Sequence, residues 1–338
     1  MLFFIVDKGA IRVKIAIFGM KYYNYTESIS YALQQLGHNV LMAENNERNR
    51  KNLEQKEQLV KFKPDLFINF CGNYFEDTID EEFLKKLSSC KKILMYADAI
   101  SFVGKVEQHF SLYDKIFVFE PSDVVLMKNK YNIDALVSTA SVAEEIHCQN
   151  YGDVEKIYDI SFVGVMTEER IEFFDEIAEF AYNNGYKMIC YGHFWHDKHW
   201  WQSFFSKRKF ARKHPFLSKF AVNKYLEPKD AALMYKKSKI CLNKHINRHQ
   251  GLNYRTFEIM ANENFILCDE RIQANDYGLV NGNNIIFYKN ADDCKSKIKY
   301  YLEHKSEREK IALNGSVLIK NNYTTRKAME KILKSIFC

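Results

Sequence analysis

The segment LNYRTFEIMANENFILCDE, residues 252–270, joins an amphipathic helix pattern to a short apolar run that ends in two acids. Asn253, Arg255 and Glu258 place three polar side chains within the first two turns of this helix, which we expect over residues 253–262. The following run is typical of a buried strand. A polar helix start above a parallel sheet lies where open α/β proteins bind anionic ligands.

The same alternation of strand and helix patterns continues on both sides of this segment. Short apolar runs rich in Ile, Val and Phe alternate with amphipathic stretches, which is typical of a parallel sheet with crossover helices. In the first half, we expect strands over 12–18, 39–43, 65–70, 92–97, 115–119 and 134–138, and helices over 25–36, 47–62, 79–89 and 121–130. In the second half, we expect strands over 158–164, 186–192, 239–243, 264–270 and 284–288.

Each series opens with a strand that ends in glycine, Gly19 in the first and Gly164 in the second, followed by a loop and a helix. This is the layout of a doubly wound unit. We therefore predict an α/β fold with two doubly wound, Rossmann-like domains that face a cleft. The first domain covers residues 1–150 and is joined by a terminal helix over 324–338, and the second covers 156–323.

The composition excludes several classes of protein. With 47% hydrophobic residues, the 338-residue chain can bury a core, and its net charge of +6 does not by itself indicate a nucleic-acid partner. Eight cysteines without a Cys-x-x-Cys pair favour a reducing cytoplasm. The apolar start is too short for a signal peptide, no run of about 18 apolar residues occurs, and Gly19 stands without the further glycines of a dinucleotide fingerprint.

Four segments together resemble the C-terminal half of GT-B glycosyltransferases, and most of all the CgeB-like, group-1-related branch. They are LNKHINRHQGLNYRTFEIMANENFILCD (242–269), GLVNGNNIIFY (278–288), KSKIKYYLEHKSEREKIALNG (295–315) and YTTRKAMEKIL (323–333). In that branch, an Asn-x-Arg-x-Phe-Glu signature, here 253–258, stands where wider retaining families carry Glu-x7-Glu. The resemblance covers 158–337 well, and the first half only loosely, through LGHNV (36–40).

The resemblance implies a hexosyltransferase-like enzyme that moves a sugar from a nucleotide diphosphate sugar, its co-substrate, to a glycan or lipid-linked acceptor. Such enzymes act in the synthesis of cell-surface polysaccharides and glycoconjugates. The first domain would hold the acceptor and the second the nucleotide sugar. The resemblance also implies retention of the anomeric configuration, with no cofactor and no metal.

Carried over by position, Glu258 matches the second acid of the family motif, which accepts hydrogen bonds from the ribose hydroxyls. A carboxylate suits a vicinal diol because its two oxygens can accept both donors, although the helix dipole alone also favours an acid near a helix start. The first acid corresponds to Gln250, which leaves the donor sugar open. Gly251, Asn253 and Arg255 are expected to bind the diphosphate, and Arg255 to act in catalysis by neutralising the leaving group.

Further candidates lie on the loop after the strand 239–243. Lys244 and Arg248 are expected to contact the pyrophosphate, ahead of His245 and His249, whereas a polar loop without a ligand is the alternative. The cations that related enzymes carry after the first strand of this domain are not obvious, because Arg170 comes a turn late.

Three more positions complete the expected site. Tyr225 and Leu226 match a short strand whose backbone meets the nucleobase, so uridine, thymidine and guanosine all stay open. Asp98, after the strand 92–97, is the candidate catalytic base or acceptor-orienting acid, ahead of Glu120. Gly19 is expected to line the acceptor side.

Residues 193–224 combine aromatic and basic side chains, the composition of an interfacial helix. They predict peripheral contact with a membrane and a cytoplasmic location that extends to its inner face, unless the aromatic side chains pack inward. A metal site at His193, His196 and His199 is disfavoured, because their three-residue spacing turns the rings apart on a helix. The alternative functions are a nucleotide-sugar-binding protein without catalysis, and a GT-B epimerase or phosphotransferase; a secreted two-lobed receptor is disfavoured.

Overall fold

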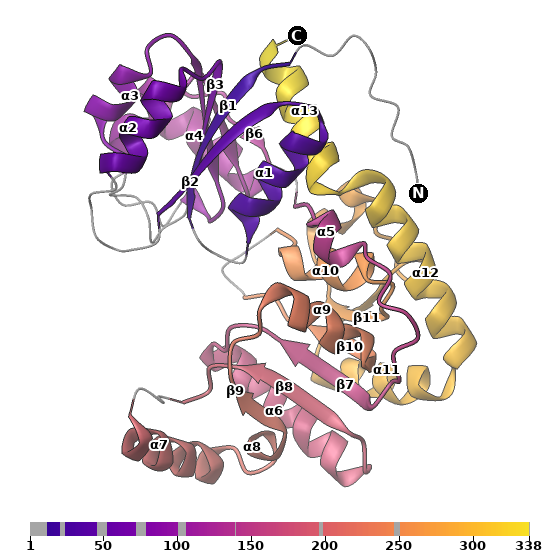
Figure 1. The fold of residues 1–338 in the computed structure, drawn as a ribbon. Helices are drawn as coiled ribbons and strands as arrows, with labels where there is room; N and C mark the ends of the chain where they lie inside the picture. Colours follow the sequence, from indigo (N-terminus) through magenta and orange to yellow (C-terminus); the bar gives the residue numbers. More distant parts are fainter. Residues whose placement is uncertain are drawn as a thin grey trace. The chain divides into compact units, whose positions relative to one another are not determined.

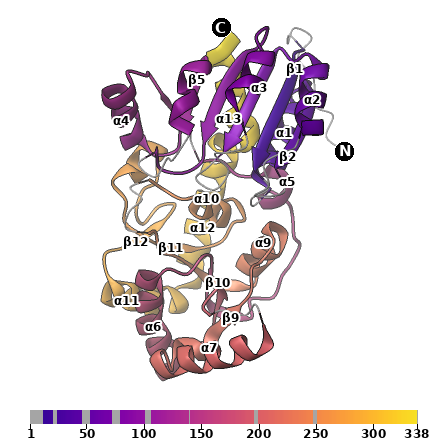
Figure 2. The same cartoon turned by 90° about the vertical axis from the view of Figure 1, so that its left-hand side faces the viewer.

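The computed structural model describes residues 12–20, 24–45, 53–71, 79–100, 106–138, 140–195, 199–246 and 251–337. The chain divides into two compact units (Figures 1 and 2). Unit 1 comprises Met1–Ala143 and Tyr323–Cys338, and unit 2 comprises Glu144–Asn322.

Unit 1 is built on a parallel sheet of the order β2-β1-β3-β4-β5-β6. Its strands are β1 (Lys14–Met20), β2 (Asn39–Asn45), β3 (Leu66–Cys71), β4 (Lys91–Tyr96), β5 (Lys115–Val118) and β6 (Leu136–Val137). Its helices are α1 (Tyr25–Gln35), α2 (Leu53–Phe62), α3 (Glu81–Lys86), the 3-10 helix η3 (Val106–Leu112), α4 (Pro121–Tyr131) and α13 (Thr325–Phe337). The strand order reverses between β1 and β3, which makes the sheet doubly wound.

Strand β1 explains why helices cover both faces of this sheet. Ile15 and Ile17 belong to the core that also holds Met329 of α13, while Ala16 and Phe18 belong to the core on the other face. A strand that is apolar on both faces needs cover on both. Helix α13, drawn in yellow beside α1 in Figure 1, therefore returns the end of the chain to unit 1.

Unit 2 has a parallel sheet of the order β12-β11-β10-β7-β8-β9. Its strands are β7 (Tyr158–Val163), β8 (Met188–Gly192), β9 (Ala221–Asn223), β10 (Ser238–Asn243), β11 (Ile266–Asp269) and β12 (Ile286–Tyr288). Its helices are α5 (Glu144–His147), α6 (Glu168–Asn183), α7 (Trp200–Lys213), α8 (Leu217–Phe220), α9 (Pro228–Lys236), α10 (Tyr254–Ala261), the 3-10 helix η4 (Ile272–Tyr277), α11 (Ala291–Glu303) and α12 (Lys305–Asn322).

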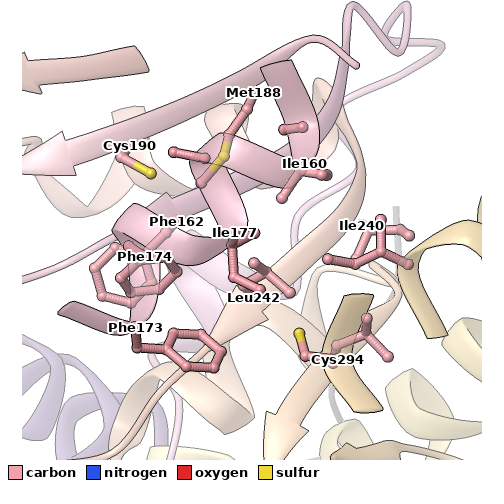
Figure 3. Packing of buried hydrophobic residues seen from close by; sticks show 14 of the residues in the cluster. Ile160, Phe162, Phe173, Phe174, Ile177, Met188, Cys190, Ile240, Leu242 and Cys294 are labelled. Atoms are coloured by element: carbon pink, nitrogen blue, oxygen red, sulfur yellow. The ribbon is translucent and has the colours of Figure 1, made fainter. Parts of the chain in front are cut away.

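The core of unit 2 lies between this sheet and α6 with α11. Phe162 of β7 packs on Phe174 of α6, with ring centroids 4.2 Å apart, and Ile160 and Leu242 are fully buried beside them (Figure 3). On the other side of the sheet, α9 packs against β7 and β10, α10 packs against β10 and β11, and α12 packs against α10. The strand order reverses between β7 and β10, so the carboxyl ends of these two strands flank the switch point where such folds bind ligands.

The predicted fold class is confirmed: the chain forms two six-stranded parallel α/β sheets, each doubly wound. The structure also contains elements that the sequence patterns did not predict. Strand β9 is three residues long, too short for a periodic signal, and the four-residue α5 lies between the expected strands 134–138 and 158–164, where we predicted no helix. Part of the helix expected over 47–62 falls outside the described residues, and α2 begins at Leu53.

Candidate active site

Helix α10 begins at the carboxyl edge of the unit-2 sheet, one residue after Asn253. The backbone of Asn253 is extended, and its side-chain Oδ1 accepts a hydrogen bond from the N–H of Thr256 at 3.1 Å. This contact is a side-chain N-cap, which satisfies one of the N–H groups left over at a helix start. The signature that opens with Asn253 therefore fixes where the helix starts.

Asn243, the last residue of β10, connects this cap to the sheet. Its buried Nδ2 donates to Asn253 Oδ1 at 3.0 Å and to Thr256 Oγ1 at 2.8 Å, and its Oδ1 accepts from Arg255 Nη1 at 3.1 Å. The hydroxyl of Tyr288 donates to its backbone carbonyl at 2.8 Å. Asn243 is not among the predicted site residues, because a polar residue at a strand end has no distinctive sequence pattern.

Arg255 reaches from α10 across the switch point to the end of β7. A Cβ atom at Gly164 would lie 2.1 Å from Arg255 Nη2, so the guanidinium occupies the space that a side chain at position 164 would need. The same guanidinium lies 5.0 Å from the ring centroid of Phe162, within the range of a cation–π contact. Helix α10 thus supplies a cation at the end of β7, where we had found no obvious one in the sequence.

Arg170, which seemed a turn too late, bridges the same two strands from α6. It is buried, and its Nε donates to the carbonyl of Lys244 at 2.8 Å while its Nη1 donates to that of Val165 at 2.7 Å. Burial, and then the nearby charge of Arg255, lower the pKa of Arg170 to about 9. Two neighbouring guanidinium groups raise the electrostatic potential at the switch point, which favours an anion there.

Asp269, at the end of β11, anchors the loop that follows β10. Its Oδ1 accepts from the N–H of His245 at 2.8 Å and from His245 Nδ1 at 2.7 Å, and its Oδ2 accepts from Arg271 Nη2 at 2.8 Å. Lys244 Nζ lies 3.5 Å from the same Oδ2. Burial raises the pKa of Asp269, but the hydrogen bonds and charges of His245 and Arg271 outweigh it and hold this pKa well below its usual range.

His245 links Asp269 to the start of α10 through its two ring nitrogens. Its Nε2 accepts from the N–H of Asn253 at 3.1 Å, so the proton lies on Nδ1, which donates to Asp269. Burial lowers the pKa of His245, in keeping with a neutral ring. We had placed His245 behind Lys244 as a ligand contact, but the buried ring faces the protein and positions the loop.

Within the part of the chain that the structure describes, one group has potential metal ligands close together. Atoms of His245, Cys268 and Asp269 lie within 4.8 Å of one another, and all three residues are buried. The ring nitrogens of His245 and both oxygens of Asp269 already take part in hydrogen bonds, and Arg271 and Lys244 already balance the carboxylate. The cluster is therefore best explained as an internal hydrogen-bond network.

Glu258 lies one turn further along α10 than Arg255 and is half-buried. His147 of α5 faces it, with Nε2 3.9 Å from Oε1. On the α9 side is the buried Tyr235, which forms a hydrogen bond with Arg255, and its pKa is raised by burial and then by Glu258. Residues from three helices therefore surround this carboxylate.

The remaining predicted residues of unit 2 lie in two loops. Gly251 is buried just before the α10 cap, whereas Arg248 and Gln250 lie outside the described residues. Tyr225, which is exposed, and Leu226, which is buried, follow β9 and precede α9, so the short strand ends before them.

The predicted acceptor-side residues lie in unit 1. A Cβ at Gly19 would lie 2.2 Å from Thr26 Oγ1, so this glycine lets α1 pack closely on β1. Asp98 is half-buried beyond the end of β4, and Glu120 is the buried N-cap residue of α4. The structure thus brings Lys244, Asn253 and Arg255 together in unit 2 and places Gly19 and Asp98 at strand ends of unit 1.

Comparison with known proteins gives this arrangement a context. A family model described as "Glycosyl transferase-like" matches residues 170–334. Among curated protein sequences, none matches the chain significantly.

Solved structures match over nearly the whole chain. A glycosyltransferase from Rickettsia africae has a TM-score of 0.64 at 13% identity, covering 96% of this chain and 97% of its own. Sucrose-phosphate synthase from Thermosynechococcus elongatus has a TM-score of 0.62 at 10% identity, covering 96% and 99%. Anabaena HepE in complex with UDP and glucose has a TM-score of 0.63 at 9% identity, also covering 96% and 99%. The fold is that of GT-B glycosyltransferases, and the family match over residues 170–334 supports the same class for this chain.

Proposed function

We propose that this glycosyltransferase takes its sugar from a nucleoside diphosphate sugar bound at the switch point of unit 2. The observation that carries the proposal is the position of Arg255, whose guanidinium lies between the ends of β7 and β10. Arg170 and Lys244 add positive charge nearby, and the capped start of α10 adds N–H donors and the positive end of its dipole. A diphosphate, with its concentrated negative charge, suits this edge.

Uridine is the first base to test. Anabaena HepE is described in complexes with UDP and with UDP-glucose, and S. aureus TarM in one with UDP. In our proposal Glu258 accepts hydrogen bonds from the ribose, the loop of Tyr225 and Leu226 meets the base, and Gly251 with the amides after it contacts phosphate. Lys244 and Arg248 complete the phosphate contacts, and Gln250 faces the transferred sugar.

In the proposed reaction, the bond between the sugar and the diphosphate breaks while the acceptor hydroxyl bonds to the anomeric carbon. Arg255 stabilises the negative charge that develops on the leaving diphosphate, so no metal is required. Asp98 orients the acceptor hydroxyl or accepts its proton, and Gly19 lines that side. Retention of configuration, and membership of the CgeB-like, group-1-related branch, are part of the proposal and rest on the Asn-x-Arg-x-Phe-Glu signature.

Calorimetry with UDP tests the donor site. Glu258→Gln should weaken UDP binding about tenfold or more, because a hydrogen bond to a charged group contributes roughly 1.5 to 3 kcal/mol. Glu179→Gln, which neutralises an exposed acid on α6 of the same unit, is the matched control and should bind like the wild type. Equal affinity of the wild type and Glu258→Gln would remove Glu258 from the site.

A turnover assay separates an enzyme from a protein that only binds nucleotide sugars. Incubation with UDP-glucose or UDP-N-acetylglucosamine should release UDP slowly to water, and EDTA should leave the rate unchanged. Arg255→Gln should abolish the release. Tight binding of both donors without any release would favour the inactive binder.

We further propose that the acceptor is a glycan or a lipid-linked saccharide of cell-surface polysaccharide synthesis, reached from the cytoplasmic side of the membrane. Trp201, Phe204 and Phe205 of α7 are 50%, 56% and 65% exposed, and Arg208 and Arg212 follow on the same helical face. Phe210, on the opposite face, is buried against Phe194. The aromatic side chains on the outer face therefore do not pack inward, and an apolar and cationic face matches an anionic bilayer surface.

No helix in the described ranges is long and apolar enough to span a bilayer, so the proposed contact is peripheral. The protein should cosediment with vesicles of phosphatidylcholine and phosphatidylglycerol, but not with phosphatidylcholine alone, and less as salt rises. Changing Arg208, Lys209 and Arg212 to Gln should prevent cosedimentation. The same change at the exposed Lys299, Lys305 and Lys310 of α11 and α12 should not. Equal cosedimentation of the two triple variants would exclude α7 as the contact.

A further inference from the structure

The side chain of Glu258 is bordered by His147, a residue that the sequence analysis did not mention. His147 is the last residue of α5 and is 3% exposed. Helix α5 packs against α9 and α10, and the Nε2 of His147 lies 3.9 Å from Glu258 Oε1. A buried imidazole beside a half-buried carboxylate can restrict the orientations that the carboxylate adopts.

The other ring nitrogen shows which tautomer His147 has. Asn262, the C-cap residue of α10, has its Nδ2 2.8 Å from His147 Nδ1 and 2.9 Å from the carbonyl oxygen of Glu258. An amide NH2 group only donates, so Nδ1 accepts and the ring proton lies on Nε2. Rotating the amide by half a turn would place its oxygen against the carbonyl of Glu258, which disfavours that orientation.

The result is a closed arrangement around one residue. Asn262 Nδ2 lies 2.9 Å from the backbone carbonyl oxygen of Glu258 and 2.8 Å from His147 Nδ1, and His147 Nε2 lies 3.9 Å from Glu258 Oε1, just beyond hydrogen-bond length. Burial lowers the pKa of His147 to about 3, so the ring is neutral at physiological pH. A neutral donor attracts the carboxylate without cancelling its charge.

We propose that His147 is a positioning residue that uses its Nε2–H to hold the Glu258 carboxylate in the orientation that accepts the ribose hydroxyls of the donor. This inference rests on the proposed function, because it takes Glu258 as the ribose contact. Helix α5 begins at Glu144, the first residue of unit 2. His147 therefore contributes to this contact from the first helix of unit 2.

Two amide substitutions separate the two nitrogens of the ring. The amide of a glutamine reaches the place of Nε2, so His147→Gln keeps a donor for Glu258 and loses the contact with Asn262. The amide of an asparagine reaches only the place of Nδ1, so His147→Asn keeps an acceptor for Asn262 and loses the donor. Thermal melting of both variants reports how much each change costs in stability.

We expect His147→Asn to weaken UDP binding about fivefold, the effect of losing one weak contact to a charged group, and His147→Gln to bind nearly like the wild type. In steady state, His147→Asn should raise KM for the donor and leave kcat nearly unchanged. A purely structural role predicts the opposite order, because His147→Asn keeps the buried hydrogen bond to Asn262. Wild-type affinity in His147→Asn, or weaker binding by His147→Gln than by His147→Asn, would overturn the inference.

A second measurement needs neither a variant nor a ligand. The ¹⁵N chemical shifts of His147 in the wild-type protein should show the Nε2–H tautomer, without titration between pH 5 and 8. A ring that carries its proton on Nδ1, or that becomes charged in this range, would overturn the inference even if UDP binds. If the tautomer is as expected but Glu258→Gln binds UDP like the wild type, then Glu258 is not the ribose contact. In that case the role proposed for His147 is refuted as well.

Discussion

Replacing Gly164 by alanine would displace Arg255 without touching its charge. Gly164 does not have a positive φ, so an alanine is compatible with its backbone. The added methyl carbon would lie 2.1 Å from Arg255 Nη2 and 2.6 Å from Cζ. Because atoms in van der Waals contact lie about 3.5 Å apart, the end of the guanidinium has to retreat by roughly 1.4 Å. The fold should survive, since the atoms that must move belong to the end of a flexible side chain.

The retreat breaks the 3.1 Å hydrogen bond to Asn243 and moves the charge away from the ends of β7 and β10. A hydrogen bond between a charged group and its ligand contributes roughly 1.5 to 3 kcal/mol, and about 1.4 kcal/mol corresponds to tenfold in affinity. We therefore expect Gly164→Ala to weaken UDP binding at least about tenfold in calorimetry.

A double-mutant cycle tests whether the effect passes through Arg255. If it does, Gly164→Ala combined with Arg255→Gln should bind UDP no more weakly than Arg255→Gln alone. UDP affinity in Gly164→Ala equal to that of the wild type would refute the placement of Arg255 as a phosphate contact. Losses that simply add in the double variant would show that position 164 acts by another route.

Three further substitutions test how the site is supported. Asp269→Asn should lower the free energy of unfolding by about 3 kcal/mol at neutral pH, because the buried groups that bind the Asp269 carboxylate lose its negative charge. The folded-state pKa of Asp269 is depressed, so the carboxylate stabilises the folded protein above the ordinary Asp pKa of about 3.9. The difference in stability between the variant and the wild type should therefore shrink only in acid, below that pH. Arg170→Lys keeps the charge but cannot reproduce both hydrogen bonds to Lys244 and Val165, so denaturant unfolding should show a loss of about 1 to 3 kcal/mol. Gly19→Ala should destabilise the protein by about 1 to 3 kcal/mol through its clash with Thr26 and leave UDP affinity unchanged; weaker UDP binding in a stable Gly19→Ala would instead give this glycine a role in the site.

The architecture could be predicted well from the sequence, because the patterns that indicate helices and strands involve residues close together in the chain. Periodicity located eleven of the twelve strands in the described residues to within a few residues, and the expected helix over 253–262 is α10 with its two cap residues, Asn253 and Asn262. Strand β9 was missed because three residues carry no period. Local signals of this kind depend on neighbouring residues in the chain, which a single sequence displays directly.

The supporting residues of the site could not be predicted, because their partners are distant in sequence. Asp269 lies 24 residues from His245, Arg170 lies 74 from Lys244, and Asn262 lies 115 from His147. Each is a polar residue at the end of a helix or strand, or in its first turn, where the usual explanation is capping. The strand order, which brings β7, β10 and β11 to neighbouring positions, accounts for the first two contacts, and the packing of α5 against α10 accounts for the third.

In our proposal, the cation that contacts the diphosphate is Arg255 of α10, and it does not come from the loop after β7 where we had looked for it. A positively charged side chain at the end of β7 can come from the loop after β7. It can also come from a helix that begins beside the neighbouring strand β10. Helix α10 begins beside the neighbouring strand β10, Gly164 leaves the space, and Phe162 offers a ring face on which a guanidinium can rest. A search of the residues after β7 alone finds only Arg170, whose Nε and Nη1 bind backbone carbonyls and hold the two strand ends together. The two arginines therefore have different roles. The buried Arg170 holds the ends of β7 and β10 together, and Arg255 on α10 supplies the positive charge that we expect to contact the diphosphate.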